Sequence, residues 1–175
     1  YKRQVVYPFG YGLSYTTFDV ETVSAGVVNS NCTSEANKLY AKVRVTNTGK
    51  FSGKEVVQVY IAKPQGKLGK PAKELAAFEK TRELQPGESQ LMILTWEIND
   101  MASYDDLGKV KKSAYVLEAG SYDIYVGTSV RDVTKADYSY ILNHDVITEQ
   151  LSAKLVPTSL PKRMLADGSY EALPQ

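Results

Sequence analysis

The sequence predicts an all-β protein, built as an antiparallel β-sandwich. Two observations predict it: short runs of residues alternate between apolar and polar side chains, and turn-forming Gly, Pro and Asn separate these runs. A third, the 43% apolar content, is enough for a buried core. With 175 residues, the chain fits one domain with a tail, at roughly 100–200 residues per domain.

Alternation with a period of two identifies the individual strands. The most regular run ends at Asn47-Thr48-Gly49, which is a turn signal, and another carries Trp96 in its apolar set. One run, residues 56–62, is apolar on both faces, which predicts a strand that is covered on both sides. The predicted strands cover residues 39–46, 56–62, 90–98, 115–118, 122–126 and 138–142.

Three segments are less clear from the pattern. Residues 73–84 have the composition of a helix, but the bounding Pro71 and Pro86-Gly87 favour a strand pair with a bulge. Residues 99–103 are expected to form one helical turn, capped by Asn99 or Asp100. Residues 146–155 fit either a helix or a strand.

The C-terminal part has a weaker pattern. Residues 166–175 are expected to form a turn with no further element after it. Three prolines, Pro157, Pro161 and Pro174, indicate an extended tail that packs on another surface.

Charge and composition exclude several classes of partner and site. The 21 Lys and Arg residues against 20 Asp and Glu residues give a net charge of +1, which argues against a dedicated nucleic-acid or membrane-surface protein. No apolar run approaches the roughly 18 residues of a membrane-spanning helix. A single cysteine, Cys32, and a single histidine, His144, exclude an internal disulfide and metal sites built from several Cys or His. No signal peptide is visible, and the localisation stays open.

The sequence offers no residue with a catalytic, cofactor-binding or metal-binding pattern. The pair His144-Asp145 is expected to be a surface pair, and Asp105-Asp106 to belong to a solvated loop or a helix cap. Residues 10–12 have the glycine spacing of a phosphate-binding loop, but no helix and no lysine follow them.

One segment differs from the rest, because residues 8–18 hold four aromatic residues, two glycines and a proline. We interpret this segment as a rigid aromatic corner that docks against another domain, since so many rings are rarely left in water. The alternative is a turn into the first strand, with Phe9 and Phe18 in the core.

This segment resembles the opening of the fibronectin type III-like domain of glycoside hydrolase family 3 enzymes, the β-glucosidases and their relatives. Further similar pieces follow in the family's order: residues 45–49, 53–60, 73–75 with Phe78, 84–88 and 118–129. The resemblance spans residues 7–131, and the region after Val133 is similar to the extension of members whose sandwich precedes the barrel.

The resemblance implies an immunoglobulin- or fibronectin type III-like antiparallel β-sandwich with an extended C-terminal tail. Residues 1–15 would be an incoming linker with the aromatic corner, 16–143 the sandwich, and 144–175 a C-terminal extension. In this family the catalytic residues lie in an (β/α)₈ barrel and an α/β domain, so the module itself has no catalytic residue, no cofactor and no metal. The parent would be a retaining exo-glycosidase acting on β-glucosides, β-xylosides or related sugars.

The implied partners are the barrel and the α/β domain of the same polypeptide, with carbohydrate contacted only indirectly and neither nucleic acid nor membrane involved. The expected interface residues are Phe9, Tyr11, Leu13 and Tyr15, with Tyr1 and Tyr7 nearby. Residues 65–70 are expected to form an exposed loop, from which Lys67 and Lys70 reach the aglycone side of the active site. Two other classes remain open: a carbohydrate-binding module with exposed aromatic rings, and a cell-surface spacer or adhesion sandwich.

Overall fold

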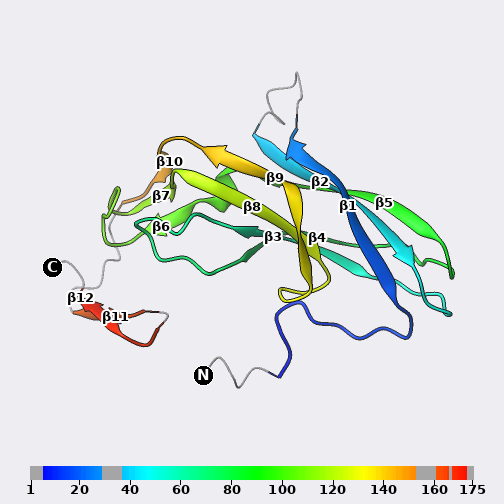
Figure 1. Ribbon diagram of the computed structural model, residues 1–175. Helices are drawn as coiled ribbons and strands as arrows, with labels where there is room; N and C mark the ends of the chain where they lie inside the picture. Colours follow the sequence, from blue (N-terminus) through cyan, green and yellow to red (C-terminus); the bar gives the residue numbers. More distant parts are fainter. Residues whose placement is uncertain (1–5, 29–36, 153–160, 166, 173–175) are drawn as a thin grey trace.

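The computed structural model describes residues 6–28, 37–152, 161–165 and 167–172, and nearly all of its regular elements are strands (Figure 1). The elements are β1 (Phe18–Val27), β2 (Lys38–Asn47), β3 (Val56–Ala62), β4 (Glu74–Lys80), β5 (Ser89–Glu97), η1 (Asn99–Met101), β6 (Ser103–Asp105), β7 (Ala114–Leu117), β8 (Gly120–Gly127), β9 (Val133–Leu142), β10 (Val146–Gln150), β11 (Lys162–Met164) and β12 (Tyr170–Ala172).

Two antiparallel sheets form the body of the protein. One has the strand order β1-β2-β5, and the other has the order β4-β3-β8-β9. At the two edges, β1 lies beside β9 and β4 lies beside β5, so the sheets close over a shared core. The predicted antiparallel β-sandwich is confirmed.

The core lies between these sheets and follows the period of two in the sequence. On β2, every second residue from Leu39 to Val45 is buried, and β5 turns Met92, Leu94 and Trp96 toward the same space. The facing sheet contributes the apolar residues of β3 and β8, including the fully buried Ile124. Each large apolar side chain buried in this way contributes about 1.5–3 kcal/mol. The core therefore fixes which face of each strand remains available for contacts outside the domain.

The segment with helical composition forms the strand β4, as predicted. It pairs with β3, and the register shifts between Val59 and Tyr60, which places a bulge in this pair. Ala76 and Ala77 pack against the core from β4. Pairing with a buried neighbour strand outweighs the local helix propensity of this segment.

A third, smaller sheet with the order β10-β7-β6 lies at one end of the sandwich, on the left of Figure 1. It resolves the ambiguous residues 146–155, because residues 146–150 form a strand that pairs with β7. The short strand β6 was not predicted, since three residues are too few to show a pattern. Through this small sheet, β10, which belongs to the expected C-terminal extension, is bound to the strands within residues 103–117.

Two local predictions are wrong. The single turn at residues 99–101 exists, but its N-cap is Ile98, and no side chain caps it. The expected turn without a following element at residues 166–175 is also wrong, because β12 pairs with β11. The strands β11 and β12, of three residues each, are too short to show an alternation in the sequence. The predictions that concern Tyr1, Cys32, Pro157 and Pro174 lie outside the described residues.

Candidate docking surface and the neighbouring loop

The aromatic corner lies before β1 and passes under the turn that joins β8 to β9 (Figure 1). Its backbone is held by the sandwich: the Val130 N–H donates to the Phe9 carbonyl at 3.0 Å, and the Gln58 amide donates to the Gly10 carbonyl at 2.9 Å. A turn bond from the Tyr11 N–H to the Pro8 carbonyl, 3.1 Å long, closes the corner. The path of this segment is therefore fixed by contacts with residues far along the chain.

Gly10 is required at the centre of this corner for two reasons. Its φ of +78° lies in the left-handed region, which side chains other than glycine rarely adopt. A Cβ atom at this position would also lie 2.0 Å from the Gln58 side-chain oxygen. The glycine between two aromatic residues thus allows the backbone to approach the sheet closely.

Beneath the corner, two polar side chains of β3 lie on the outer face of the four-stranded sheet and are nevertheless buried. The Gln58 amide also donates to the Thr128 carbonyl at 2.6 Å, and its oxygen accepts from the Tyr60 hydroxyl at 2.5 Å. The Phe9 ring meets the Tyr60 ring edge-on, with 6.5 Å between the centroids. Burial raises the pKa of Tyr60. The corner therefore covers Gln58 and Tyr60 on the outer face of this sheet.

The other end of the segment is held at the start of β1. The Thr16 hydroxyl donates to the Asn47 side-chain oxygen at 2.8 Å, and the Thr17 carbonyl accepts from the N–H groups of Thr48 and Gly49. Asn47 itself is buried and donates to the Leu84 carbonyl at 2.9 Å. Both ends of the segment are thus bound to the sandwich through hydrogen bonds.

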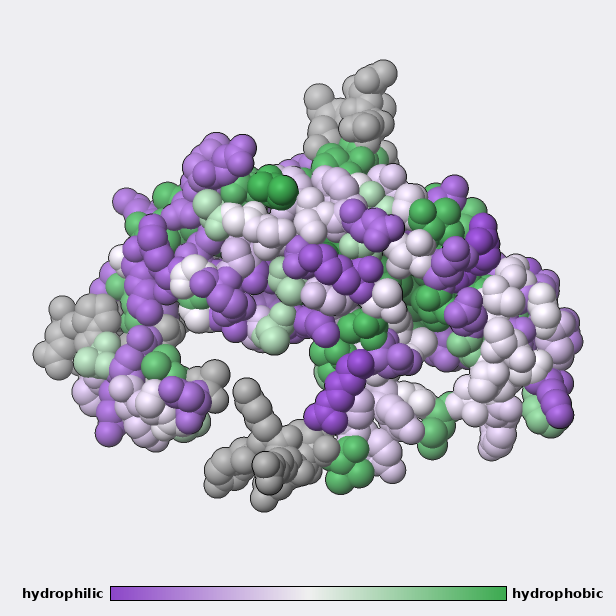
Figure 2. All heavy atoms as spheres, viewed as in Figure 1, coloured by the Kyte–Doolittle hydropathy of each residue, from purple (hydrophilic) through white to green (hydrophobic). Residues whose placement is uncertain are grey.

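The predicted interface side chains nevertheless remain largely exposed. Phe9 is 64% exposed, Tyr11 47%, Leu13 87% and Tyr15 97%. Tyr7 is also exposed and stacks on Tyr11, with 5.1 Å between the ring centroids. In Figure 2 the segment before β1 lies below the body of the sandwich, with polar and apolar residues mixed along it. The alternative of a core position is not supported for Phe9, because most of its surface is exposed, whereas Phe18 packs against the core as that alternative expected.

Phe78 of β4 adds an exposed ring that the sequence reasoning did not select for contact. It lies opposite Gln58 in the register of β3 and β4, beside the residue that holds the corner. Alternation places Phe78 on the face opposite to its neighbour Ala77, which packs against the core.

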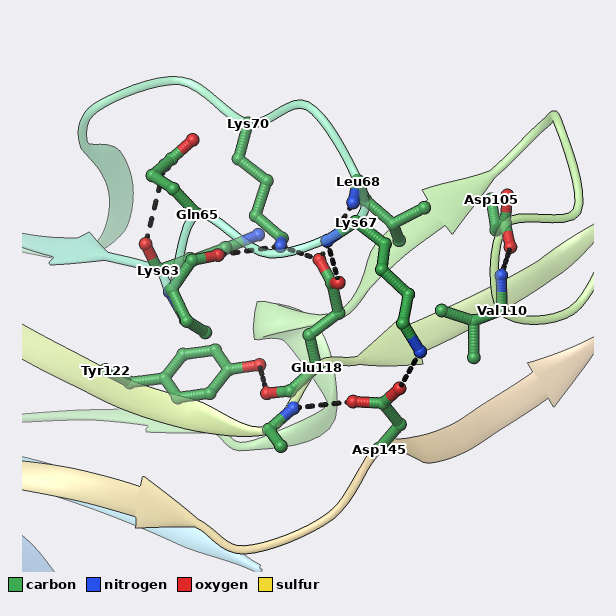
Figure 3. A network of polar contacts seen from close by, with 12 residues as sticks. Lys63, Gln65, Lys67, Leu68, Lys70, Asp105, Val110, Glu118, Tyr122 and Asp145 are labelled. Atoms are coloured by element: carbon green, nitrogen blue, oxygen red, sulfur yellow. Dashed lines mark hydrogen bonds and ion pairs between the residues drawn. The ribbon is translucent and has the colours of Figure 1, made fainter.

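The loop of residues 65–70 differs from the exposed loop that was predicted, because it is folded around the carboxylate of Glu118 (Figure 3). This carboxylate accepts from the Lys67 N–H at 2.5 Å and from the Leu68 N–H at 3.2 Å, and it forms an ion pair with the Lys70 ammonium. The side chains of Lys70 and Glu118 are only 1% and 3% exposed. A buried charge needs such a partner, since it would otherwise lose its hydration without compensation.

The prediction of exposure is therefore wrong for Leu68 and Lys70. The Lys70 ammonium also donates to the Pro64 carbonyl at 2.8 Å, which turns it further toward the interior. Lys67 remains more than half exposed, and its ammonium lies 3.2 Å from the Asp145 carboxylate. Sequence reasoning missed Glu118, because its partners lie about 50 positions away in the chain.

Asp145 links the loop to the start of β10. Its carboxylate accepts from the Ala119 N–H at 2.8 Å and pairs with Lys67. The Ala119 hydrogen bond, with a further contribution from Lys67, lowers the pKa of Asp145. Nearby, burial and then the negative charge of Glu118 raise the pKa of the Tyr122 hydroxyl, which donates to the Glu118 carbonyl at 2.9 Å.

Asp105 is a structural residue and not a solvated one. It is fully buried, and its two carboxylate oxygens accept four backbone N–H groups from residues 108–111, at 2.7 to 3.0 Å. Burial alone would raise its pKa, but these four hydrogen bonds lower the pKa of Asp105. The prediction of a solvated loop is therefore wrong for Asp105, whereas His144 lies on the surface as expected.

A metal site and a membrane-spanning helix are both absent from the part of the chain that the structure describes. No group of three or more His, Cys, Asp or Glu side chains is placed to hold a metal ion there. No helix in that part has the length and apolar character needed to cross a membrane.

Comparisons with known proteins agree with the fold of the sandwich. Residues 55–130 match the family model for the fibronectin type III-like domain. The chain contains a fibronectin type III-like domain. Among solved structures, a β-glucosidase from Paenibacillus barengoltzii matches 98% of this chain and 20% of its own, with 43% identity and a TM-score of 0.81. A GH3 β-glucosidase from Bifidobacterium adolescentis, 31% identical, matches with a TM-score of 0.62 over 79% of this chain and 18% of its own.

Two sequence relatives of this domain are β-glucosidases as well. Over 99% of its length, the chain is 58% identical to β-glucosidase A of Butyrivibrio fibrisolvens and covers 22% of that protein. It is 42% identical to a β-glucosidase of Ruminococcus albus, with 99% of this chain and 18% of the relative covered. The resemblance to the fibronectin type III-like domain of glycoside hydrolase family 3 enzymes is confirmed, and the chain spans about a fifth of the relatives it matches.

Proposed function

We propose that this fibronectin type III-like domain is a non-catalytic module of a longer, retaining β-glucosidase-type enzyme and that it braces the catalytic domains. One observation carries the proposal: the chain aligns over 99% of its own length with β-glucosidases of which it covers only 18 to 22%. In the proposed division, residues 1–15 lead into the module, 16–143 form the sandwich, and 144–175 are a C-terminal extension, whose strand β10 pairs with β7. The proposed partners are the barrel and the α/β domain of the same polypeptide.

The proposed docking surface is the aromatic corner, with Phe9, Tyr11, Leu13 and Tyr15 as contact residues. Two properties support it: the backbone is fixed by hydrogen bonds to Gln58 and Val130, and the four side chains remain exposed. A surface that is ordered before contact loses little conformational entropy on docking. An interface of about 800 Å² on each side, centred on such side chains, is enough to fix the orientation of two domains.

A role in carbohydrate binding is the main alternative, because sugars stack on exposed aromatic rings. The stacking of Tyr7 on Tyr11 leaves only one face of each of these two rings for a sugar. A pull-down of the chain on insoluble glucans tests this alternative directly. Retention on glucan that Tyr11→Ala abolishes would favour the carbohydrate-binding function over the bracing function.

A contact with the aglycone side of the active site is proposed for Lys67 alone. Its side chain is more than half exposed, whereas the Lys70 ammonium is buried against Glu118. Replacing Lys67 by Ala in the full enzyme should raise KM for long substrates more than for short ones. Equal KM values for both substrate lengths in the variant and the wild type would remove this contact from the proposal.

Oxidative footprinting tests the bracing function in the enzyme itself. Tyr11, Leu13 and Tyr15 should react with hydroxyl radicals in the isolated chain and be protected in the full-length parent enzyme. Ile93, an exposed residue on the opposite sheet, provides a reference for labelling efficiency between the two samples. Equal reactivity of the corner in both samples would contradict the proposed docking surface.

A further inference from the structure

The single tryptophan of the chain carries a buried hydrogen-bond donor without a protein partner. Trp96 lies on β5, is 5% exposed, and belongs to the core of the sandwich. Its indole nitrogen is the one buried side-chain polar atom without a hydrogen-bond partner among the described residues. Leaving such a group unpaired costs about 1–3 kcal/mol, and folded proteins satisfy nearly all of them with a protein acceptor or an ordered water.

A small pocket lies beside this indole, at the edge where β4 and β5 bring the two sheets together. Its volume is about 60 Å³, and it is lined by Trp96 together with residues of β3, β4 and η1. One water molecule needs roughly 10–15 Å³ by the same measure. The pocket therefore has room for a water in contact with the tryptophan.

The chemistry of the lining favours water over an empty apolar cavity. Ile61 and Met101 supply apolar walls, whereas Lys63, Glu74 and Asp100 supply charged groups. The Lys63 side chain is 4% exposed, and its ammonium pairs with the Glu74 carboxylate. Pockets of this size that are lined only by apolar groups stay dry, but one with several polar groups holds an ordered water.

We propose that this pocket is a binding site for a structural water that accepts the hydrogen bond of the Trp96 indole. The water donates its own two hydrogens to acceptors of the lining, for which the carboxylates of Glu74 and Asp100 are the available groups. The site joins the two sheets through a solvent molecule at the edge beside β4. This inference does not depend on the proposed function, because it concerns only residues within the chain.

The single tryptophan makes the site directly measurable. A ¹⁵N-labelled sample gives one indole N–H signal, and this signal should show a cross-peak to a long-lived water. A high-resolution crystal structure, of the chain or of the longer enzyme that carries it, should show a water at about 2.9–3.2 Å from the indole nitrogen. In Trp96→Phe, which keeps an aromatic ring without the donor, that density should be lost or displaced.

A second variant tests the acceptor side of the site. Asp100→Asn, on an exposed position of η1, changes the group that faces the water without removing core volume. The indole proton signal should shift in this variant, whereas Asp106→Asn outside the pocket should leave it unchanged. A wild-type indole that bonds directly to a protein oxygen, or a pocket without water density, would overturn the proposal.

Discussion

The aromatic corner and the loop of residues 65–70 both have a composition typical of contact surfaces, yet the structure uses them in opposite ways. In the corner the backbone is bound to the sandwich and the side chains of Leu13 and Tyr15 point outward. In the loop two backbone N–H groups bind Glu118, and the Lys70 side chain is buried against the same carboxylate. The difference shows that the direction of a side chain depends on partners that a local pattern does not reveal.

The physical reason is the set of interactions that each region would lose if its side chains pointed in the opposite direction. Lys70 finds in Glu118 a partner that compensates for the loss of its hydration, and Glu118 also binds two backbone N–H groups of the loop. Beneath the corner, the buried side chains of Gln58 and Tyr60 already occupy the outer face of β3. Four exposed apolar side chains on a fixed backbone are therefore available for another surface.

The largest effect is expected from breaking the buried ion pair. Glu118→Ala leaves the Lys70 ammonium buried and unpaired and removes the acceptor of two backbone N–H groups. The free energy of unfolding, measured by urea denaturation of the chain, should fall by about 3–5 kcal/mol. The control is Glu21→Ala, which removes an exposed ion pair with Arg44 and should cost less than about 1 kcal/mol. Similar losses in both variants would contradict the special role of Glu118.

An intermediate effect is expected from strain in the corner. Gly10→Ala places a Cβ atom against Gln58 in a backbone with positive φ, so unfolding free energy should fall by about 1–3 kcal/mol. Gly12→Ala is the matched control, because a Cβ atom there meets no atom within 4 Å. Amide hydrogen exchange of Val130 should rise only in Gly10→Ala, since that N–H group is bonded to the corner. Equal stability of the two variants would show that the corner is not held by its close approach to β3.

A smaller effect with a definite pH dependence is expected at Asp145. The Ala119 N–H and Lys67 lower the pKa of Asp145 in the folded chain. The contribution of this carboxylate to the free energy of unfolding is therefore complete above its pKa in the unfolded chain, which is about 4. The contribution is lost as the pH falls through the lowered folded value. Asp145→Asn should therefore be less stable than wild type at pH 7, by about 1 kcal/mol or less, and this difference should shrink below about pH 4. A difference that is the same at pH 7 and pH 3 would exclude the carboxylate as its source.

Much of the fold could be predicted because its signals are local. The alternation on β2 and β5 and the doubly apolar run of β3 follow directly from which faces are buried. The short strands β6, β11 and β12 could not be predicted, because three residues show no period. The candidate site was predictable to a similar extent. The corner is visible in the sequence as a local cluster of aromatic rings. The burial of Lys70 depends on Glu118, which lies 48 residues further along the chain.

The central claim, that the corner is exposed in the domain because it docks elsewhere in a longer enzyme, can be tested in one comparison of melting temperatures. The double variant Leu13→Ser and Tyr15→Ser removes two side chains that are 87% and 97% exposed. In the isolated chain, surface substitutions of this kind change stability by no more than about 0.5 kcal/mol, so its melting temperature should stay constant. In the full-length parent enzyme the same variant should melt several degrees lower, because a buried interface loses its apolar contacts. An unchanged melting temperature in both proteins would contradict the account.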